Sequence, residues 1–160
     1  MQLYCPTCRE MNDWGSETCT HCGAPLRGPE GETYVEKLIW ALHHRDASTA
    51  LRAATILGDL RAREATGALE EVLSEPETDP YLGAAAARGL GAIGDEGSLG
   101  VLVEALERGP LPVRLAAVEA LEDMGPREEA VRALQQASRD GSLSVSEASK
   151  KVMDRWSRLA

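Results

Sequence analysis

The sequence predicts an all-α fold, a solenoid of about three to four stacked helical hairpins, with a small cysteine-rich module before it. Three observations support this prediction. Leu57, Leu90 and Leu121 stand in similar alanine-rich segments that recur with a period of roughly 30 residues. All four cysteines fall near the start of the chain, between Cys5 and Cys22. Phenylalanine is absent and aromatic residues make up only 4%, which favours close-packed helices over sheets.

The size and charge of the chain limit its classes of function. Its 160 residues suffice for one ordinary domain, or for a small domain plus a minimal module. A net charge of −9 opposes binding to nucleic-acid phosphates and to anionic membranes. No apolar run approaches the roughly 20 residues that span a bilayer, and none resembles a signal peptide. We therefore expect a cytoplasmic protein with no membrane partner, and nucleic acid is disfavoured.

The cysteines form the pattern C-x2-C, ten residues, C-x2-C, made of Cys5, Cys8, Cys19 and Cys22. A two-residue gap lets two thiolates approach one tetrahedral ion from a single tight turn, so two such pairs supply four ligands. Four thiolates close the coordination shell, which predicts a structural rather than a catalytic Zn2+. Iron in a rubredoxin-like site would use the same sulfurs, and the sequence leaves that alternative open.

Other cysteine chemistries fit this pattern less well. Disulfides are disfavoured in a reducing compartment, and a thiol redox site uses one C-x-x-C at a helix start rather than two converging pairs. Haem attachment needs a histidine directly after a pair, where Arg9 and Gly23 stand instead. His21 lies between two ligands and cannot reach the same ion, so we expect it to face solvent.

Residues 1–26 resemble the short zinc-ribbon domains that are common at bacterial protein termini. The likeness rests on Cys5-Pro6-Thr7-Cys8, on Asn12 and on the run from Cys19 to Leu26. Gly23 can take the positive φ that lets backbone amides point at sulfur, whereas Arg9 stands where these ribbons usually carry a second glycine. The polar Gly/Pro segment 27–32 then predicts a linker, and residues 33–160 form the helical part.

Helix signals follow one another along this helical part. Thr33 and Glu36 form a predicted capping box that opens a helix over about 34–44. Each alanine-rich segment is followed by a short turn and a second amphipathic helix, so each unit is a helix pair. Prolines mark the expected helix starts and glycines the expected ends; the prolines are Pro80, Pro112 and Pro126, and the glycines are Gly58, Gly94, Gly109 and Gly125.

The last segment predicts a C-terminal capping helix. Ser144 and Glu147 form a second predicted capping box at its start. Apolar residues then recur at helical spacing up to Leu159, and Trp156 is interpreted as the core anchor of this helix.

The helical part as a whole resembles HEAT-like repeats, of the short kind found in phycobilisome lyases and in many bacterial scaffold proteins. Val113-Arg114 followed by Leu121 matches the HEAT pattern closely. The Asp and Arg residues that often form a ladder between such repeats are present only in part, as Asp46, Asp79 and Arg114. The resemblance implies a concave surface, built by the second helix of each pair, that receives partners.

Equivalent outward positions on these second helices predict a binding face. Aligning the helices places Trp40, Glu71, Glu104 and Gln136 at the same position, and Glu36 and His43 flank Trp40 by helical spacing. The expected face is acidic at its centre and aromatic at its N-terminal end. Two other interpretations stay open, because charged positions can be a merely solvated face and the indole of Trp40 can be covered by the chain's own ribbon.

The sequence favours a non-enzymatic protein-interaction scaffold that binds a protein, preferably through a basic segment. No nucleophile is paired with a base in a recognisable motif, and no phosphate-binding loop is present. One alternative is a nucleic-acid-associated zinc-ribbon protein, with a basic edge made of Arg52, Arg61, Arg63, Arg114 and Arg127. Another, from the lyase-like resemblance, is an accessory subunit of a lyase-like enzyme.

Overall fold

The computed structural model describes the chain except residues 1, 6, 9, 14–15, 27–32 and 160. Pro6, Arg9 and the expected linker 27–32 therefore lie outside the described residues. The described elements are β1 (Gln2–Tyr4), β2 (Met11–Asp13), α1 (Tyr34–Ala41), α2 (Ala47–Asp59), η1 (Arg63–Ala65), α3 (Thr66–Ser74), α4 (Pro80–Ile93), η2 (Glu96–Ser98), α5 (Leu99–Arg108), α6 (Leu111–Met124), α7 (Glu128–Ala137) and α8 (Leu143–Ser157).

The N-terminal module is a short antiparallel hairpin followed by a loop. β1 pairs with β2 so that Leu3 lies opposite Asn12. A single bridge between Thr18 and Pro25 closes the loop that carries the second cysteine pair. These pairings leave Cys5 directly after the first strand and bring the two C-x2-C turns to one end of the hairpin.

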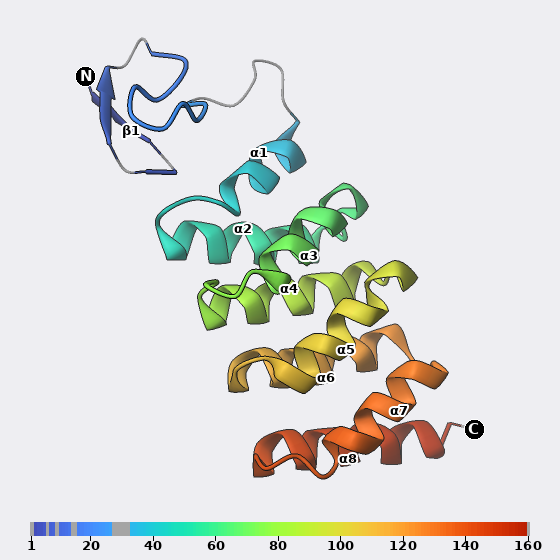
Figure 1. Cartoon of the computed structure of the whole chain (residues 1–160). Coiled ribbons are helices and arrows are strands. Elements are labelled where there is room, and N and C mark those ends of the chain that lie inside the picture. The colour runs from blue at the N-terminus through green and yellow to red at the C-terminus, as the bar shows by residue number, and fades with distance from the viewer. Residues whose placement is uncertain (1, 6, 9, 14–15, 27–32, 160) are drawn as a thin grey trace.

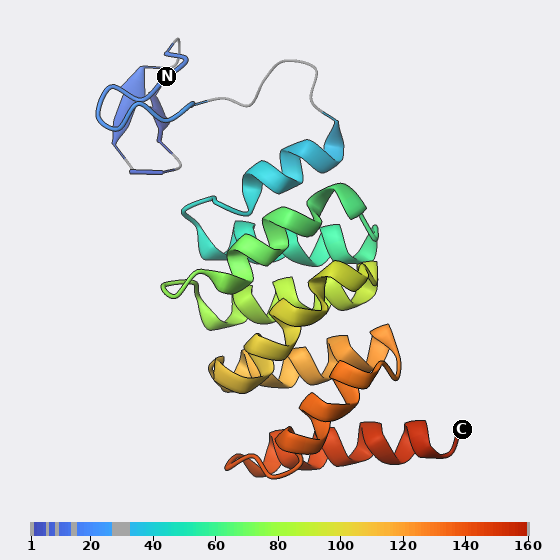
Figure 2. The ribbon, with the colours of Figure 1, turned by 45° about the vertical axis from the view of Figure 1, so that its right-hand side comes forward.

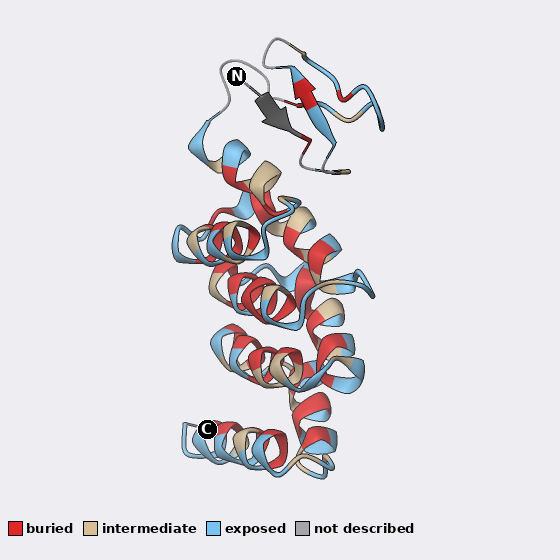
Figure 3. Ribbon diagram, turned by 90° about the vertical axis from the view of Figure 1, so that its left-hand side faces the viewer, coloured by how far each residue is buried: buried red, intermediate tan, exposed pale blue. Residues whose placement is uncertain are grey.

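The helices stack in two layers, as Figures 1 and 2 show. One layer holds α2, α4, α6 and α8 in succession, and the other holds α1, α3, α5 and α7. Helices contact their neighbours within a layer and the helices beside them in the other layer. Figure 3 shows the buried residues gathered where helices face one another. The predicted all-α solenoid is confirmed, and no helix in the described part of the chain combines the length and apolarity needed to cross a bilayer.

The internal repeat produces equivalent core positions. Leu57, Leu90 and Leu121 are all fully buried, on α2, α4 and α6 respectively. Small residues let these helices approach closely: a Cβ added to Gly58 would lie 2.8 Å from the Cα of Gly89. The stack is therefore held by backbone contact between neighbouring helices as well as by leucine packing.

The predicted capping box at the start of α1 is confirmed. Thr33 donates its backbone N–H to Glu36 Oε2 at 2.6 Å, and Glu36 donates its N–H to Thr33 Oγ1 at 3.2 Å. The helix ends at Ala41 rather than near residue 44. The chain tightens there into i to i+3 hydrogen bonds, and His44 Nδ1 then accepts the N–H of Asp46, the N-cap of α2.

The predicted start of the last helix is wrong. α8 begins at Leu143 with Ser142 as its N-cap, so Ser144 lies inside the helix and forms no capping box with Glu147. The helix starts early because Asp140 Oδ1 accepts the N–H of Ser142 at 2.7 Å and orders the preceding turn. Leu159 lies beyond the helix end and is 81% exposed, whereas Trp156 is buried as expected.

Ion pairs join successive repeats on the surface of the stack. Their partners are 31 to 33 residues apart, close to the repeat period; the pairs are Arg88 with Glu119, Arg127 with Glu96, and Arg155 with Glu122. The expected Asp and Arg ladder takes a different form. Asp79 caps α4 by accepting the N–H groups of Tyr81 and Leu82, while Arg114 pairs with Asp140 at 3.1 Å.

Candidate functional site

The four cysteines converge on one point in the N-terminal module. Their sulfur atoms all lie within 4.8 Å of one another, with 3.6 Å between Cys5 and Cys22 and 3.4 Å between Cys8 and Cys19. Four Zn–S bonds of about 2.3 Å in a tetrahedron require sulfur atoms about 3.8 Å apart. The donor set therefore fits a tetrahedral ion with a closed shell of four sulfurs.

Backbone amides support two of these sulfurs. Cys8 donates its N–H to Cys5 Sγ at 3.4 Å, and His21 donates its N–H to Cys19 Sγ at 3.4 Å. Gly23 adopts a φ of +73°, the left-handed conformation expected for the turn after Cys22. The His21 side chain faces solvent, as predicted.

The pKa shifts of Cys19 and Cys8 have opposite directions. Burial opposes the thiolate at Cys19, but N–H groups of Cys22 and His21 outweigh it and lower the Cys19 pKa to about 6. At Cys8 a hydrogen bond from the Glu10 backbone favours the thiolate, yet burial and the crowded neighbouring sulfurs raise the Cys8 pKa to about 12. Repulsion between neighbouring sulfurs thus disfavours ionisation of all four cysteines together. A bound divalent cation would offset this repulsion and stabilise the four thiolates.

Asn12 is a supporting residue whose role the sequence did not reveal. It is buried, and its Nδ2 donates to the Glu10 carbonyl at 2.8 Å and to Cys19 Sγ at 3.6 Å. Its Oδ1 accepts the N–H of Thr20 at 2.9 Å and the hydroxyl of Thr20 at 3.1 Å. The side chain therefore ties the hairpin to the turn that carries the second cysteine pair.

The predicted binding face lies on one layer of the stack. Glu36 and Trp40 are on α1, Glu71 on α3, Glu104 on α5 and Gln136 on α7, while His43 directly follows α1. All are exposed except Trp40, which is half-buried. Among the described residues, no side-chain hydrogen bond or ion pair joins two of the six.

Two carboxylates of this face already have partners within the chain. The Glu36 carboxylate accepts the N–H of Thr33, and that hydrogen bond lowers the Glu36 pKa. The Glu104 carboxylate accepts from Arg108 Nη1 at 2.9 Å, a pair that is well exposed. Together with Glu71, these groups give the face carboxylates on α1, α3 and α5.

A cleft of about 610 Å3 opens at one edge of the stack, and sequence reasoning missed it. Residues of the five-residue loop 75–79, between α3 and α4, line it, and so does the two-residue turn 109–110, between α5 and α6. Leu73, Val101 and Val113 line it with apolar surface. The only sequence signal that we find for this cleft is the difference in length between the two connections, five residues for loop 75–79 and two for turn 109–110.

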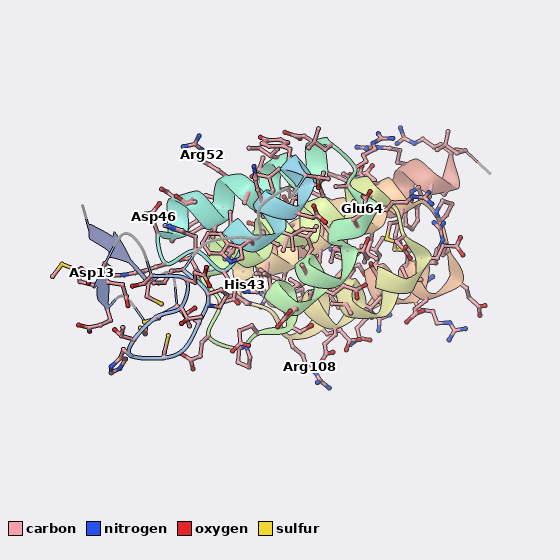
Figure 4. The ribbon with its side chains drawn as sticks, turned by 90° about the horizontal axis from the view of Figure 1, so that it is seen from above. Asp13, His43, Asp46, Arg52, Glu64 and Arg108 are labelled. Atoms are coloured by element: carbon pink, nitrogen blue, oxygen red, sulfur yellow. The ribbon has the colours of Figure 1, made fainter. Side chains whose placement is uncertain are left out.

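Charged side chains also line this cleft. Glu75, Asp79 and Glu104 contribute carboxylates, and Arg108 contributes one guanidinium, which is paired with Glu104. Figure 4 shows Arg108 on one side of the stack and Arg52 projecting from the opposite side. The cleft is therefore apolar inside, with a net negative lining.

The expected basic edge is partly neutralised. Arg114 pairs with Asp140, and Arg127 pairs with Glu96 at 2.9 Å. These two arginines belong to the contacts that hold the stack together.

Comparisons with known proteins agree with this architecture. A family model described as HEAT repeats matches residues 35–122 and, in a second match, residues 77–152. Among solved structures, the chain is similar to the complex of CpcE and CpcF of phycocyanin lyase from Nostoc sp. PCC7120, with 22% identity and a TM-score of 0.56. That alignment covers 82% of this chain and 67% of the other. No curated protein matches. Since the family matches span most of the helical part, the chain belongs to the HEAT-repeat family.

Proposed function

We propose that this chain is a non-enzymatic interaction scaffold that binds a basic segment of a protein partner on the face formed by α1, α3, α5 and α7. The observation that carries the proposal is the open two-layer stack, in which α1, α3, α5 and α7 form one layer. Extended surfaces of this kind are what helical repeats use for recognition. The similar solved structure, itself a complex of two lyase proteins, supports a protein partner.

The side chains of the face have distinct roles in this proposal. Trp40 supplies an aromatic anchor at the N-terminal end, because a half-buried indole gains most from a partner that completes its burial. Glu71 and Glu104 attract basic groups near the centre. Gln136 offers amide hydrogen bonds at the far end, and Glu36 and His43 border Trp40.

The N-terminal cysteines have a structural role in this proposal. We assign Zn2+ to the four sulfurs, because a tetrahedral set of thiolates suits this ion and leaves no position for water or substrate. Metal analysis of the purified protein should give one zinc per chain and a colourless solution. Visible absorption with one iron per chain would instead assign a rubredoxin-like centre.

Capture of a partner from native lysate tests the face. A variant combining Trp40→Ala, Glu71→Lys and Glu104→Lys should lose the captured protein while keeping its far-UV circular dichroism, because all three side chains lie on the surface of the proposed face. Asp123→Lys with Glu147→Lys is the matched control, since both acids are exposed on the other layer. Equal capture by the face variant and the wild type would refute the assignment.

Nucleic acid is tested in the same preparation. A net charge of −9 and the pairing of Arg114 and Arg127 with carboxylates support the protein partner over a phosphate backbone. Titration with labelled single- and double-stranded oligonucleotides should show no saturable binding at micromolar concentration. Saturable binding that weakens steeply with salt would replace the proposal with a nucleic-acid function.

A further inference from the structure

Exposed apolar side chains recur along one edge of the stack. Tyr81, Leu111 and Leu143 are the first or second residues of α4, α6 and α8, and they are 67%, 44% and 72% exposed. Their spacing follows the repeat period, since each stands at the start of the first helix of its unit. Figure 2 shows the starts of these helices along the same edge of the stack. A large apolar side chain in water at equivalent places in three units is typical of a contact surface.

Two residues of this row are next to cleft residues in the sequence. Tyr81 directly follows Pro80, and Leu111 directly follows Pro110, and both prolines line the cleft. An exposed apolar residue therefore directly follows a lining residue of the cleft at the start of α4 and again at the start of α6. A ligand that contacted these residues and the cleft would be larger than a small molecule confined to the cleft itself.

The negative charge of the cleft indicates which kind of partner it binds. Glu75 and Asp79 line the cleft without a basic side chain within ion-pairing distance in the described part of the chain. Glu77 adds a third carboxylate to the same five-residue loop, which carries no Lys or Arg. Arg108, by contrast, is paired with Glu104. A partner with a positive charge next to an apolar group complements both features.

We propose that the cleft between loop 75–79 and turn 109–110 binds a short extended segment of a partner protein, in which apolar residues are separated by short intervals that contain Arg or Lys. The apolar side chains enter the cleft against Val101 and Val113, and the basic residues meet Glu75 and Asp79. Tyr81 and Leu111 hold the segment on either side. This inference deepens the proposed scaffold function and depends on it, since it names the chemistry of the partner.

The geometry sets the spacing of the segment. Helices packed side by side lie about 8–10 Å apart, and an extended polyproline-II chain advances about 3.1 Å per residue and returns a side chain to the same face every third residue. Contacts with the starts of α4 and α6 should therefore come from residues about three positions apart. The recognised pattern is an apolar residue, two intervening residues of which one is basic, and a second apolar residue.

Panning a random library of displayed twelve-residue peptides against the full zinc-loaded chain tests this inference. The expected result is enrichment of peptides with that apolar and basic pattern. Their affinity, measured as synthetic fluorescent peptides, should fall about tenfold or more for Val101→Glu, which places a carboxylate in the apolar lining. Failure to enrich any peptide, or enrichment of acidic ones, would overturn the proposal.

Two further variants separate binding from folding. Glu75→Gln with Asp79→Asn removes both charges, while the new asparagine still offers a capping side chain to α4, and this variant should weaken binding and flatten its salt dependence. Tyr81→Ser with Leu111→Ser changes only exposed side chains and should also weaken binding. The matched controls are Glu64→Gln with Glu129→Gln, and Tyr34→Ser with Leu60→Ser, which should leave peptide affinity unchanged.

The outcomes distinguish this inference from the scaffold function. Peptides that lose binding to the Trp40→Ala and Glu71→Lys variant, but bind all cleft variants normally, would keep the scaffold and refute the cleft. If sedimentation shows a dimer that Val101→Glu disrupts, the occupant is a second copy of the chain and the partner segment is refuted. Peptides that depend on the cleft alone would confirm the cleft while refuting the larger face.

Discussion

Asn12 connects the two halves of the cysteine cluster through four hydrogen bonds of its amide. Residues that orient metal ligands typically affect affinity by about 10- to 100-fold when removed. We predict that Asn12→Ala lowers Zn2+ affinity by about this factor. Competition with a chromophoric chelator measures the change. Thr20→Val, which removes only the hydroxyl contact, should have a smaller effect, and equal affinities in all three proteins would contradict the role of Asn12.

Asp46 makes the stability of the helical part depend on pH. Its Oδ2 accepts from the hydroxyl of Ser48 at 2.6 Å and from the hydroxyl and N–H of Thr49, and these hydrogen bonds lower the Asp46 pKa to about 2. A carboxyl whose pKa is lowered on folding stabilises the folded state above its unfolded pKa, near 3.8. That contribution is lost as the pH falls from about 4 to about 2.

Urea unfolding between pH 5 and pH 2 measures this contribution. The midpoint of the wild type should fall across this range. Asp46→Asn still caps the helix but cannot titrate, so its midpoint should fall less steeply. Parallel curves for the two proteins would show that the lowered pKa does not stabilise the fold.

At the scale of elements, the contact between α4 and α6 depends on the absence of a side chain. A Cβ on Gly91 would lie 2.5 Å from the Cα of Ala120 and 2.7 Å from its Cβ. Because the obstacle is another helix backbone, we predict that Gly91→Ala destabilises the fold by about 1–3 kcal/mol. The change in free energy of unfolding is measured with urea.

Gly100 provides the matched control for that substitution. It lies in α5, is exposed, and has nothing within 4 Å of an added Cβ. Gly100→Ala should therefore stabilise the fold by about 0.4–1 kcal/mol, through helix propensity and a less flexible unfolded chain. Destabilisation by both variants would show that packing at Gly91 is not the cause.

The elements that could be predicted from sequence are those with local signals. Thr33 and Glu36 specify their capping box over a single helical turn, and Leu57 and Leu90 mark the repeat. The partner of Arg114 could not be predicted in this way, because Asp140 is 26 residues away and meets it only after the helices stack. Ser144 and Glu147 have the spacing of a capping box, but the helix begins before them, at Leu143. The turn before that helix is ordered by the hydrogen bond from Ser142 N–H to Asp140 Oδ1.

In the candidate site, too, the part with a local sequence signal was predictable and the part without one was not. The convergence of the four cysteines was predictable, because a fixed local spacing determines whether two thiolates can share an ion. The cleft was not, because Leu73, Val101 and Val113 come from three different helices. No local sequence pattern indicates that these residues lie close together. The cleft forms only because the fold brings the three helices together.

On the scale of the whole molecule, the residues that the structure describes form two separate apolar cores. The small one contains Cys5, Cys19 and Leu26, and it shares no residue with the core of the helical part. Such a small cluster cannot offset the conformational entropy of about 26 ordered residues, whereas structural zinc contributes on the order of 10–16 kcal/mol. The folding of the N-terminal module should therefore depend on the metal, and that of the helices should not.

Chelation tests this independence. We predict that removing the metal with EDTA makes the segment 1–26 sensitive to protease, while the far-UV helical signal and its melting temperature stay constant. Restoring Zn2+ should restore protection. A fall in the helical melting temperature would instead show that the ribbon packs against the stack, the alternative that covers Trp40 with the chain's own module.

The ion pairs between repeats have a consequence for how the stack can assemble. Positions 63, 96 and 127 are equivalent by the repeat period and hold Arg, Glu and Arg in turn, and the pair between Arg88 and Glu119 likewise joins opposite signs at equivalent places. Because the sign alternates at these three positions, deleting the middle hairpin would bring Arg63 opposite Arg127, and duplicating it would bring two copies of Glu96 face to face. The charges on the surface thus favour one order of the repeat units. Proteins that evolve from this one should therefore gain two hairpins more readily than one, because adding two keeps opposite charges in contact.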